Sequence, residues 1–450
     1  MHIPKKAPTY EASSDIIFSG DTTTREERMI ALSAGSLDDK GRYVHWDKLR
    51  FKDHPEGLSS KLWWAGIKLS RTHISTKLPI QGVDRNPLIW CEPPQVSEAL
   101  HWMDVNAAGV LSTSELIPNS GSRNTYLVRS LVEEAISSSQ LEGASTTIAQ
   151  AKEMIREGRE PEDKDQKMIL NNYHAMSFIR EMRDQSLTPN LIFELHRIVT
   201  EGTLDQPEKA GEFRNESDNV QVISVKTGEI LHTPPPANQL SERLEFLCDF
   251  ANGKMPKEFV HPVIRSIIVH FLLAYDHPFV DGNGRTARAL FYWVMLKNGY
   301  WLMEYITISK IIKRSARQYG LAFLHVESDE NDMTYFIFHQ LEVIQKAIEE
   351  LQVYLDRKQD EAKQSNELIA NNPRLLRELN SRQLALLRNA IKNPRHAYRI
   401  DDHMRSHGIT YETARRDLRR LSELNVLEKV KSGRTYIFAV PSNLQERLAG

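Results

Sequence analysis

Two apolar helical stretches with a short polar segment between them constrain the fold of this chain more than any other feature. Apolar residues recur at helical spacing through Val263, Ile267 and Phe271. A second apolar stretch, ALFYWVMLKNG, begins at Ala289, and the segment between them reads HPFVDGNGRTAR over residues 277–288. With 40% hydrophobic and 26% charged residues, the composition is that of a folded globular protein. We therefore expect a mainly α-helical fold.

The polar segment has the features of an anion site. Gly282, Asn283 and Gly284 would let backbone N–H groups converge on an anion, and the N-terminus of the following helix would add its partial positive charge. Arg285 and Arg288 are three residues apart on one helix face, so both guanidinium groups can point back toward the anion. The segment therefore predicts a phosphate site.

Two further side chains of the segment suggest chemistry on that phosphate. Asp281 supplies a hard oxygen ligand suited to Mg²⁺ that bridges phosphates, and His277 can take a proton near neutral pH. Taken singly, the loop is usually a turn, an arginine pair usually a solvated face, and such a histidine usually structural. Together they indicate nucleotide phosphate chemistry on a hydroxyl nucleophile.

The segment resembles the signature of Fic-domain proteins, His-x-Phe-x-(Asp/Glu)-Gly-Asn-Gly-Arg-x-x-Arg, at every specified position. The resemblance implies a helical Fic core that acts as a protein adenylyltransferase, with ATP as the substrate and Mg²⁺ as the cofactor. AMP would pass to a Ser, Thr or Tyr hydroxyl of a target protein or of the chain itself. The implied roles are base for His277, Mg²⁺ ligand for Asp281, phosphate contacts for Gly282, Asn283, Gly284 and Arg285, the γ-phosphate contact for Arg288, and a buried packing position for Phe279.

A β-hairpin is expected over residues 219–233, where two short β-rich runs meet at Thr227-Gly228 before three prolines. Such a hairpin is either a structural flap or an edge on which an extended peptide docks. The resemblance favours docking of the target protein. Tyr319 resembles the family's aromatic residue near the adenine, although a buried aromatic on a helix is the commoner explanation.

An inhibitory segment precedes the motif. Ser138, Glu142 and Gly143 match the family's inhibitory pattern, (Ser/Thr)-x-x-x-Glu-(Gly/Asn), of its N-terminally inhibited subclass. Ser138 and Glu142 are four residues apart and share a helix face. A carboxylate from Glu142 would pair with Arg288 and take the space that the γ-phosphate needs. The alternative is a surface glutamate, and in some family members this residue also supports removal of AMP.

The C-terminal residues differ in charge from the rest. From Ser381 to Gly450 there are 14 Lys and Arg residues and 7 Asp and Glu residues, a net charge of +7 in a chain whose total is −2. Helices over 381–393, 400–408 and 410–425, followed by two strands around Ser432-Gly433, resemble a winged helix-turn-helix. The residues that could contact DNA are Arg415, Arg416, Arg419 and Arg420 on the third helix, and Lys429, Lys431 and Arg434 on the wing. Docking of a protein is the alternative.

The remaining sequence suggests five parts: a loosely packed polar arm (1–42), a Trp-rich subdomain (43–125), a Fic core with the inhibitory helix (126–365), a linker (366–380) and the winged helix (381–450). The clustered tryptophans are either core or an aromatic ligand site. Cys91 and Cys248 are too few for a disulfide framework, and no signal peptide or membrane-length apolar run is present. A cytoplasmic protein is expected.

Two functions remain open from the sequence. The first is an autoinhibited adenylyltransferase. The second is a DNA-binding transcriptional regulator whose Fic core senses nucleotide without transferring it. A mere sensor would not need His277, so the intact motif favours the enzyme. The sequence leaves open the target, the donor nucleotide and the oligomeric state, with a homodimer as one candidate.

Overall fold

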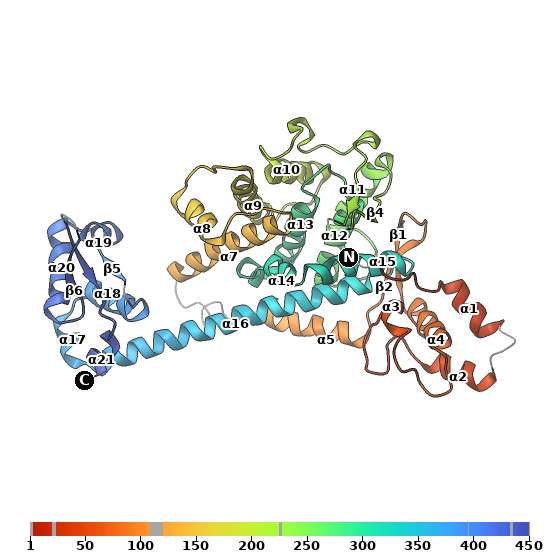
Figure 1. Ribbon diagram of the computed structural model, residues 1–450, viewed down its shortest axis with the longest axis horizontal. Helices are drawn as coiled ribbons and strands as arrows, with labels where there is room; N and C mark the ends of the chain where they lie inside the picture. The colour runs from red at the N-terminus through yellow and green to blue at the C-terminus, as the bar shows by residue number, and fades with distance from the viewer. Residues whose placement is uncertain are drawn as a thin grey trace. The chain divides into compact units, whose positions relative to one another are not determined.

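The computed structural model describes residues 3–19, 24–108, 120–224, 227–394, 396–432 and 435–449. The chain is mainly helical and divides into two compact units, Met1–Leu351 and Gln352–Gly450 (Figure 1). Helix α16 (Thr334–Ala370) continues across the boundary between them. No helix in the described ranges combines the length and apolar character that a membrane crossing requires.

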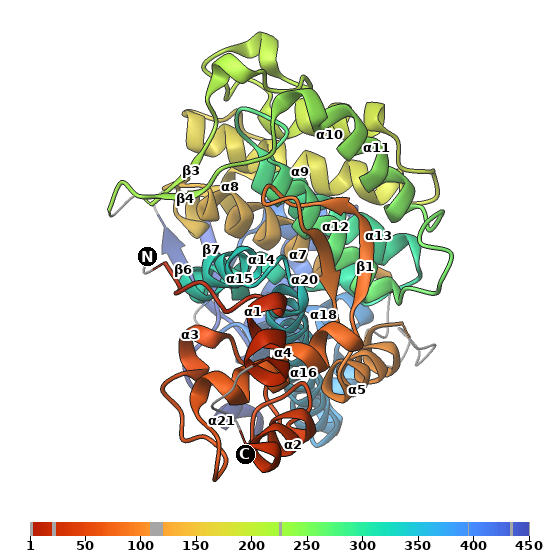
Figure 2. The ribbon, with the colours of Figure 1, turned by 90° about the vertical axis from the view of Figure 1, so that its right-hand side faces the viewer.

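Helices α12 (Pro262–Asp276) and α13 (Asn283–Lys297) form the centre of the first unit, as the two apolar stretches predict. Pro262 occupies the first turn of α12, where its missing N–H costs nothing, and nearly every residue of both helices is buried. The two helices pack against each other and are joined by the loop of the polar segment (Figure 2). This packing holds both ends of the loop in fixed positions.

Seven further helices belong to the first unit around this pair: α7 (Ser120–Leu141), α8 (Ile148–Glu157), α9 (Lys164–Glu181), α10 (Pro189–Thr200), α11 (Leu240–Ala251), α14 (Ile308–Arg314) and α15 (Ala316–Ser328). Helix α9 packs against α7, α10 and α13, and α11 packs against α12. Helix α14 contacts α7.

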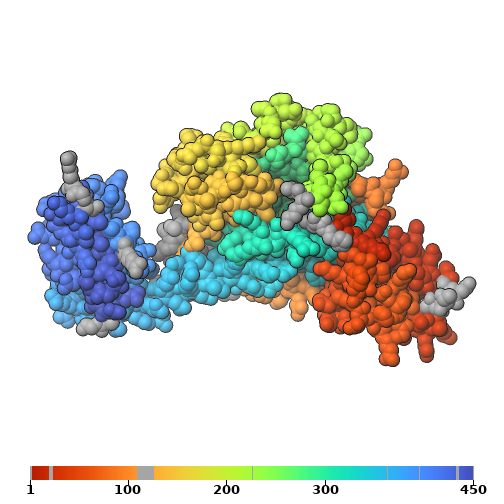
Figure 3. Space-filling view, viewed as in Figure 1, coloured from red at the N-terminus to blue at the C-terminus, as the bar shows by residue number. Residues whose placement is uncertain are grey.

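The N-terminal residues differ from the loosely packed arm that the sequence suggests. Two capped helices, α1 (Tyr10–Phe18) and α2 (Arg25–Ser33), pack on α4 (Ser60–His73), and Ile17 and Ala31 are fully buried. A Cβ on Gly66 would lie 1.9 Å from the carbonyl oxygen of Ala31, so the glycine permits a close helix contact. Residues 3–19 and 24–42 pack continuously against the residues that follow them (Figure 3). The polar composition of the N-terminal residues did not predict this packing, because it depends on segments distant in the sequence.

The remainder of the N-terminal part comprises α3 (Trp46–Leu49), a hairpin of β1 (Thr76–Gln81) and β2 (Pro87–Trp90), α5 (Pro94–Met103) and a π-helical turn over Asp104–Ala108. Four of its clustered tryptophans are core residues: Trp46, Trp63, Trp64 and Trp90 are at most 5% exposed, whereas Trp102 is partly buried. Both cysteines are free and buried, as expected, and burial raises the pKa of each thiol to about 12.

The expected hairpin over 219–233 is present but short. Strands β3 (Val222–Ile223) and β4 (Ile230–His232) pair antiparallel, with Val222 opposite His232. Gly228 has φ of +68° and donates its N–H to the carbonyl of Ser224, so glycine suits the turn. Residues 225 and 226 lie outside the described residues.

The second unit contains a three-stranded antiparallel sheet in the order β5-β7-β6. Three of its elements, α17, β5 and the last helix, were not expected from the sequence. Ile369, Leu375 and Leu379 are buried in its core, so the residues expected as a linker are packed within this unit. Its elements after α16 are α17 (Pro373–Glu378), α18 (Ser381–Lys392), β5 (Ala397–Tyr398), α19 (Ile400–His407), α20 (Tyr411–Glu423), β6 (Glu428–Ser432), β7 (Thr435–Ala439) and α21 (Leu444–Ala449).

Candidate active site

A cavity of about 310 Å³ in the first unit gathers residues from segments far apart in the sequence. The motif contributes His277, Gly284 and Arg288, and Glu142 enters from the end of α7. Tyr319 of α15 completes the set of predicted residues that line it. The cavity is therefore the candidate active site.

His277 ends α12 in the left-handed region, with φ of +47°. Its Nδ1 lies 3.0 Å from the carbonyl oxygen of Ala274, a distance at which Nδ1–H donates to the carbonyl. This tautomer leaves Nε2 without a proton and able to accept one. Burial lowers the pKa of His277, so the neutral base is the form present at neutral pH.

The loop after His277 is held rigidly by its own side chains. Asn283 accepts the N–H of Phe279 at 2.9 Å and donates to the Phe279 carbonyl at 2.8 Å, so its amide closes the loop and leaves only its backbone N–H for a ligand. Phe279 is fully buried, as expected. Gly282 has φ of +80°, and a Cβ there would lie 2.7 Å from a methyl group of Thr200. Only glycine fits this position without strain.

Helix α10 supports the loop from below through His196, a residue that sequence reasoning did not identify. The ring stacks on Phe279 with centroids 3.8 Å apart, and its Nδ1 accepts the N–H of Gly211 at 2.8 Å. Nε2–H is therefore free to donate to the main-chain carbonyl of Asp281, 2.8 Å away. Burial lowers the pKa of His196 to about 4, so the ring is neutral. His196 orients the main chain of Asp281.

Asp281 fits the predicted Mg²⁺ site. Its side chain is 52% exposed; one oxygen accepts the N–H of Gly282, and the other lies 3.4 Å from Arg285. Within the described ranges, no cluster of three or more His, Cys, Asp or Glu residues could hold a metal on its own. One carboxylate with substrate phosphates and waters is nevertheless the usual coordination of Mg²⁺ beside a nucleotide. The residues present thus fit the ion.

Arg288 and the inhibitory segment are in direct contact. The guanidinium, 2% exposed, donates Nε–H to the hydroxyl of Ser138 at 2.9 Å and Nη2–H to the Ser138 carbonyl at 3.0 Å. Nη2 also lies 2.8 Å from Oε1 of Glu142. Burial disfavours the charged guanidinium, but Glu142, together with Tyr319 and Glu134, more than offsets it, and the pKa of Arg288 is raised.

The Glu142 carboxylate lies in the anion nest itself. A Cβ on Gly284 would be 2.1 Å from Oε1 of Glu142 and 3.0 Å from Nη1 of Arg288. Gly284 is in the first turn of α13, where the helix dipole favours negative charge. The carboxylate therefore occupies a position suited to a phosphate oxygen. Gly143, with φ of +98°, turns the chain away immediately after it.

Arg285 differs from the sequence expectation that both arginines face one anion. Its fully buried guanidinium donates to the Val199 carbonyl at 3.1 Å and approaches Asp281, whereas Arg288 contacts Glu142. Arg285 does not line the cavity. Its Nε–H is buried and has no hydrogen-bond partner among the described residues.

Tyr319 lies on the wall of the cavity. Its hydroxyl is 2.9 Å from Nε2 of His270, and its ring packs at right angles to Phe323. Burial raises the pKa of Tyr319 to about 12. The phenol therefore stays neutral and presents an aromatic surface to the cavity.

Sequence reasoning also missed Glu134, which lies eight residues before Glu142 on α7. Its carboxylate, 1% exposed, accepts hydrogen bonds from the Tyr292 hydroxyl at 2.9 Å and from the backbone and hydroxyl of Ser309. Burial raises the pKa of Glu134. The spacing from Ser138 by four residues was a usable signal that Glu134 shares the inhibitory face.

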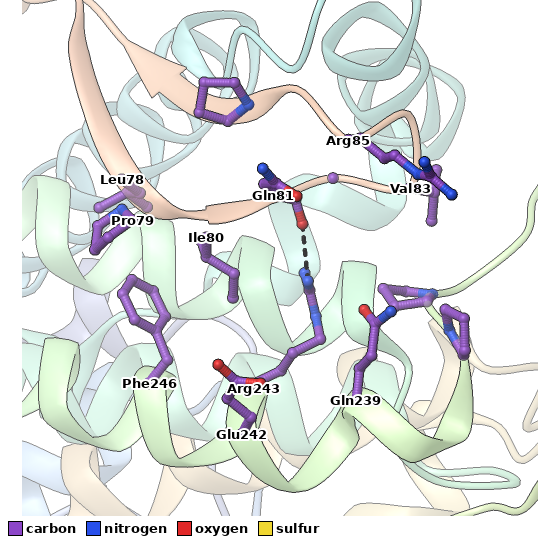
Figure 4. Close-up of a pocket in the computed structure, with 14 residues that line it drawn as sticks. Leu78, Pro79, Ile80, Gln81, Val83, Arg85, Gln239, Glu242, Arg243 and Phe246 are labelled. Carbon is purple, nitrogen blue, oxygen red and sulfur yellow. Dashed lines mark hydrogen bonds between the residues drawn. The ribbon is translucent and has the colours of Figure 1, made fainter.

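A second cavity, of about 890 Å³, lies between the β1–β2 hairpin and α11 (Figure 4). Arg243 reaches from α11 and donates to the Gln81 carbonyl at 2.8 Å, with Phe246 farther along the helix. None of the motif residues lines this cavity. It is thus separate from the candidate active site.

In the second unit, most predicted DNA-contacting arginines already have acidic neighbours. Arg415 lies 3.4 Å from Glu412, Arg419 lies 3.3 Å from Glu423, and Arg420 lies 2.6 Å from Glu378. Arg416 is exposed and forms no ion pair within the described part of the chain. Lys429 lies 4.0 Å from the ring centre of Tyr436, Lys431 is exposed, and Arg434 lies outside the described residues.

Comparison with known proteins supports the resemblance to Fic-domain proteins. Residues 186–295 match the Fic/DOC family, a span that includes the hairpin, α12 and most of α13. The protein adenylyltransferase Fic of Drosophila willistoni is 31% identical over 167 residues, 36% of this chain and 31% of that protein. The protein of the same name from Nematostella vectensis is 31% identical over 135 residues, 29% of each. The chain thus spans about three tenths of the length of these relatives.

The fold comparison extends further along the chain. The crystal structure of a Fic family protein from Desulfovibrio desulfuricans superimposes with a TM-score of 0.52 over 77% of this chain and 96% of that chain, at 19% sequence identity. The chain therefore has a mainly helical Fic-type fold. Residues 186–295, which match the Fic/DOC family, contain the complete motif.

Proposed function

We propose that the chain is an autoinhibited protein adenylyltransferase, which transfers AMP from ATP to a Ser, Thr or Tyr hydroxyl of a protein. The observation that carries the proposal is the position of Glu142, whose carboxylate pairs with Arg288 and lies against Gly284 in the cavity of His277. A negative group in this position marks where the nucleotide phosphates would bind. The named relatives support the same class of reaction.

His277 acts as the general base. The target hydroxyl gives its proton to Nε2, because Nδ1–H is committed to the Ala274 carbonyl. The hydroxyl oxygen then forms a bond to the α-phosphorus of ATP, and the bond from that phosphorus to the β-bridging oxygen breaks. Pyrophosphate leaves, and AMP remains on the target.

The loop and α13 hold the nucleotide for in-line attack. Backbone N–H groups of residues 282–284 and the guanidinium of Arg288 bind phosphate oxygens, and the positive charge of buried Arg285 stabilises the loop from the Asp281 side. Asp281 would hold Mg²⁺, which when bound neutralises phosphate charge. The aromatic wall at Tyr319 suits the base of the nucleotide.

Glu142 restrains the reaction by competing for Arg288. A γ-phosphate needs the guanidinium that the carboxylate already holds at 2.8 Å. With that contact blocked, the α-phosphate would be misaligned for attack, and a small misplacement can cost about 100-fold in rate. Removal of the carboxylate should therefore activate transfer.

The test compares Glu142→Gly with a Glu142→Gly/His277→Ala double variant, each incubated with ATP and Mg²⁺. Intact-mass analysis should find added AMP on the first protein and none on the second, while both still bind ATP. Absence of AMP from both, despite ATP binding, would refute the transferase and favour a nucleotide sensor.

A second candidate function concerns the second unit alone. Helices α19 and α20, joined by a turn at Gly408, precede the β6–β7 hairpin, an order that supports a winged helix-turn-helix. Exposed Arg416 and Lys431 would contact DNA phosphates. DNA retention by the full chain should weaken about tenfold between 50 and 200 mM salt, because each of the two phosphate contacts releases counterions. A flat salt response would exclude DNA and leave protein docking.

A further inference from the structure

His232 is the one ionisable side chain that the hairpin contributes to the active-site cavity among the described residues. It is the last residue of β4, is 8% exposed and lines the same cavity as His277 and Glu142. The mechanism above does not use it. Its environment nevertheless defines both its charge and its contacts.

Both ring nitrogens of His232 face oxygen atoms. Nε2 lies 2.7 Å from the main-chain carbonyl of Tyr275, and Nδ1 lies 3.0 Å from the carboxylate of Glu327 on α15, an ion-pair distance at which the two groups are not aligned as a hydrogen bond. A neutral imidazole carries one N–H and can serve only one of these acceptors, whereas the imidazolium serves both. Burial disfavours the charged ring, but Glu327 more than offsets it, and the pKa of His232 is raised.

These two contacts connect the hairpin to α12 and α15, two helices that line the active-site cavity. Tyr275 precedes His277 by two residues, and its ring centroid is 4.7 Å from that of His232. Glu327 is on the helix that also carries Tyr319. The titratable or charged groups that face the His232 ring are Glu327 on α15 and, at the end of α12, Tyr275, His277 and Asp276, the last paired with Arg243.

Strand pairing alone gives the hairpin little stability. Its strands have two and three residues, and Ile223 and Ile230 are 51% and 50% exposed. An isolated two-stranded hairpin is marginally stable in water. Arg214 secures the chain just beyond β4 by donating to the Pro235 carbonyl, and His232 adds contacts within the strand itself.

We propose that the His232–Glu327 pair is a latch that holds the hairpin over His277, and that His232 is a positioning residue for the target hydroxyl. The proposal rests on the transferase function above and deepens it. Because the pair needs the imidazolium, the latch is complete at low pH and opens as pH rises through the pKa of His232. A closed hairpin presents a fixed edge to an extended segment of the target.

The first measurement follows hydrogen exchange of hairpin amides in the full chain at pH 6.5. Glu327→Gln should speed exchange in residues 222–232 about tenfold, since a charge-assisted contact is replaced by a neutral one. The matched control is Glu245→Gln on α11, an exposed residue, which should leave the hairpin unchanged. Unchanged hairpin exchange in Glu327→Gln would overturn the latch.

The second measurement follows self-transfer of AMP against pH in the Glu142→Gly background. The rate should fall as pH rises above the pKa of His232, and Glu327→Gln should move this fall to lower pH. A purely structural role for His232 would lower the rate equally at every pH and would overturn positioning. If no variant transfers AMP at any pH, the transferase proposal fails, whereas the exchange result still decides the latch.

Discussion

Removal of the Glu142 carboxylate should destabilise the protein without nucleotide and make it more responsive to ATP. Arg288 is 2% exposed, and Glu142 is its only anionic partner among the described residues. In Glu142→Gly the guanidinium keeps its two hydrogen bonds to Ser138 and the weaker attraction of buried Glu134, but loses the carboxylate that pairs with it. A buried charge that loses its ion-pair partner is unfavourable.

The magnitude follows from the burial of the two partners. Loss of one member of a fully buried pair costs about 3–5 kcal/mol, but the Glu142 side chain is 29% exposed, so water reaches that side. We expect about 2 kcal/mol of lost unfolding free energy, since Ser138 continues to solvate the cation. This corresponds to a decrease of about 2–8 °C in Tm for a domain of this size. ATP phosphates would restore the missing negative charge.

Thermal unfolding with and without ATP and Mg²⁺ tests this directly. Glu142→Gly should melt lower than wild type without nucleotide, and ATP should raise its Tm by more than it raises that of wild type. Glu160→Gly, a glutamate exposed in the loop after α8, is the matched control and should behave as wild type. Equal Tm values for Glu142→Gly and wild type, with equal responses to ATP, would refute the role of the ion pair.

Three further outcomes are expected. Burial lowers the pKa of His277, and only the neutral ring accepts a proton. AMP transfer by Glu142→Gly should therefore fall as pH drops through that pKa and stay level just above it. A rate that rises on acidification would contradict the role of His277 as the general base. His196→Phe removes the donor to the Asp281 carbonyl and should raise the Mg²⁺ concentration for half-maximal transfer about tenfold, whereas an unchanged Mg²⁺ requirement would exclude this support. Asp417→Ala leaves the partners of a 1%-exposed carboxylate unpaired and should destabilise the second unit by about 3 kcal/mol, seen as faster hydrogen exchange there; unchanged protection would refute it.

The features predictable from sequence are those encoded by residues close together in the chain. The apolar stretches around residues 277–288 predict α12 and α13, and both form with the loop between them. The four-residue spacing of Ser138 and Glu142 predicts that they share a face, and both contact Arg288. Local spacing sufficed because helix geometry fixes which side chains are neighbours.

The features that the sequence did not predict depend on distant segments. His232 and Glu327 are 95 residues apart and meet only because β4 crosses the end of α12 beside α15. Gly66 carries no sequence signal that the Ala31 carbonyl will approach it, so the packed N-terminal helices were unexpected. In both cases, tertiary packing decides which groups meet.

Arg285 and Arg288 show that sequence spacing does not predict which groups a long side chain contacts. Their spacing of three places them on one helix face, yet the side chains take different partners because Asp281 and the Val199 carbonyl attract one and Glu142 the other. Spacing predicts the direction of Cα–Cβ bonds, whereas the long side chains follow local charge. Hence the guanidinium contacts could be assigned only from the structure.

The most direct test of the proposed autoinhibited transfer is the initial rate of AMP incorporation from ATP labelled at the α-phosphate, measured for wild type and Glu142→Gly at equal concentration. The contact of Glu142 with Arg288 and Gly284 predicts a rate at least about tenfold higher for the variant. A variant that incorporates label no faster than wild type would contradict the claim that this carboxylate restrains adenylyl transfer.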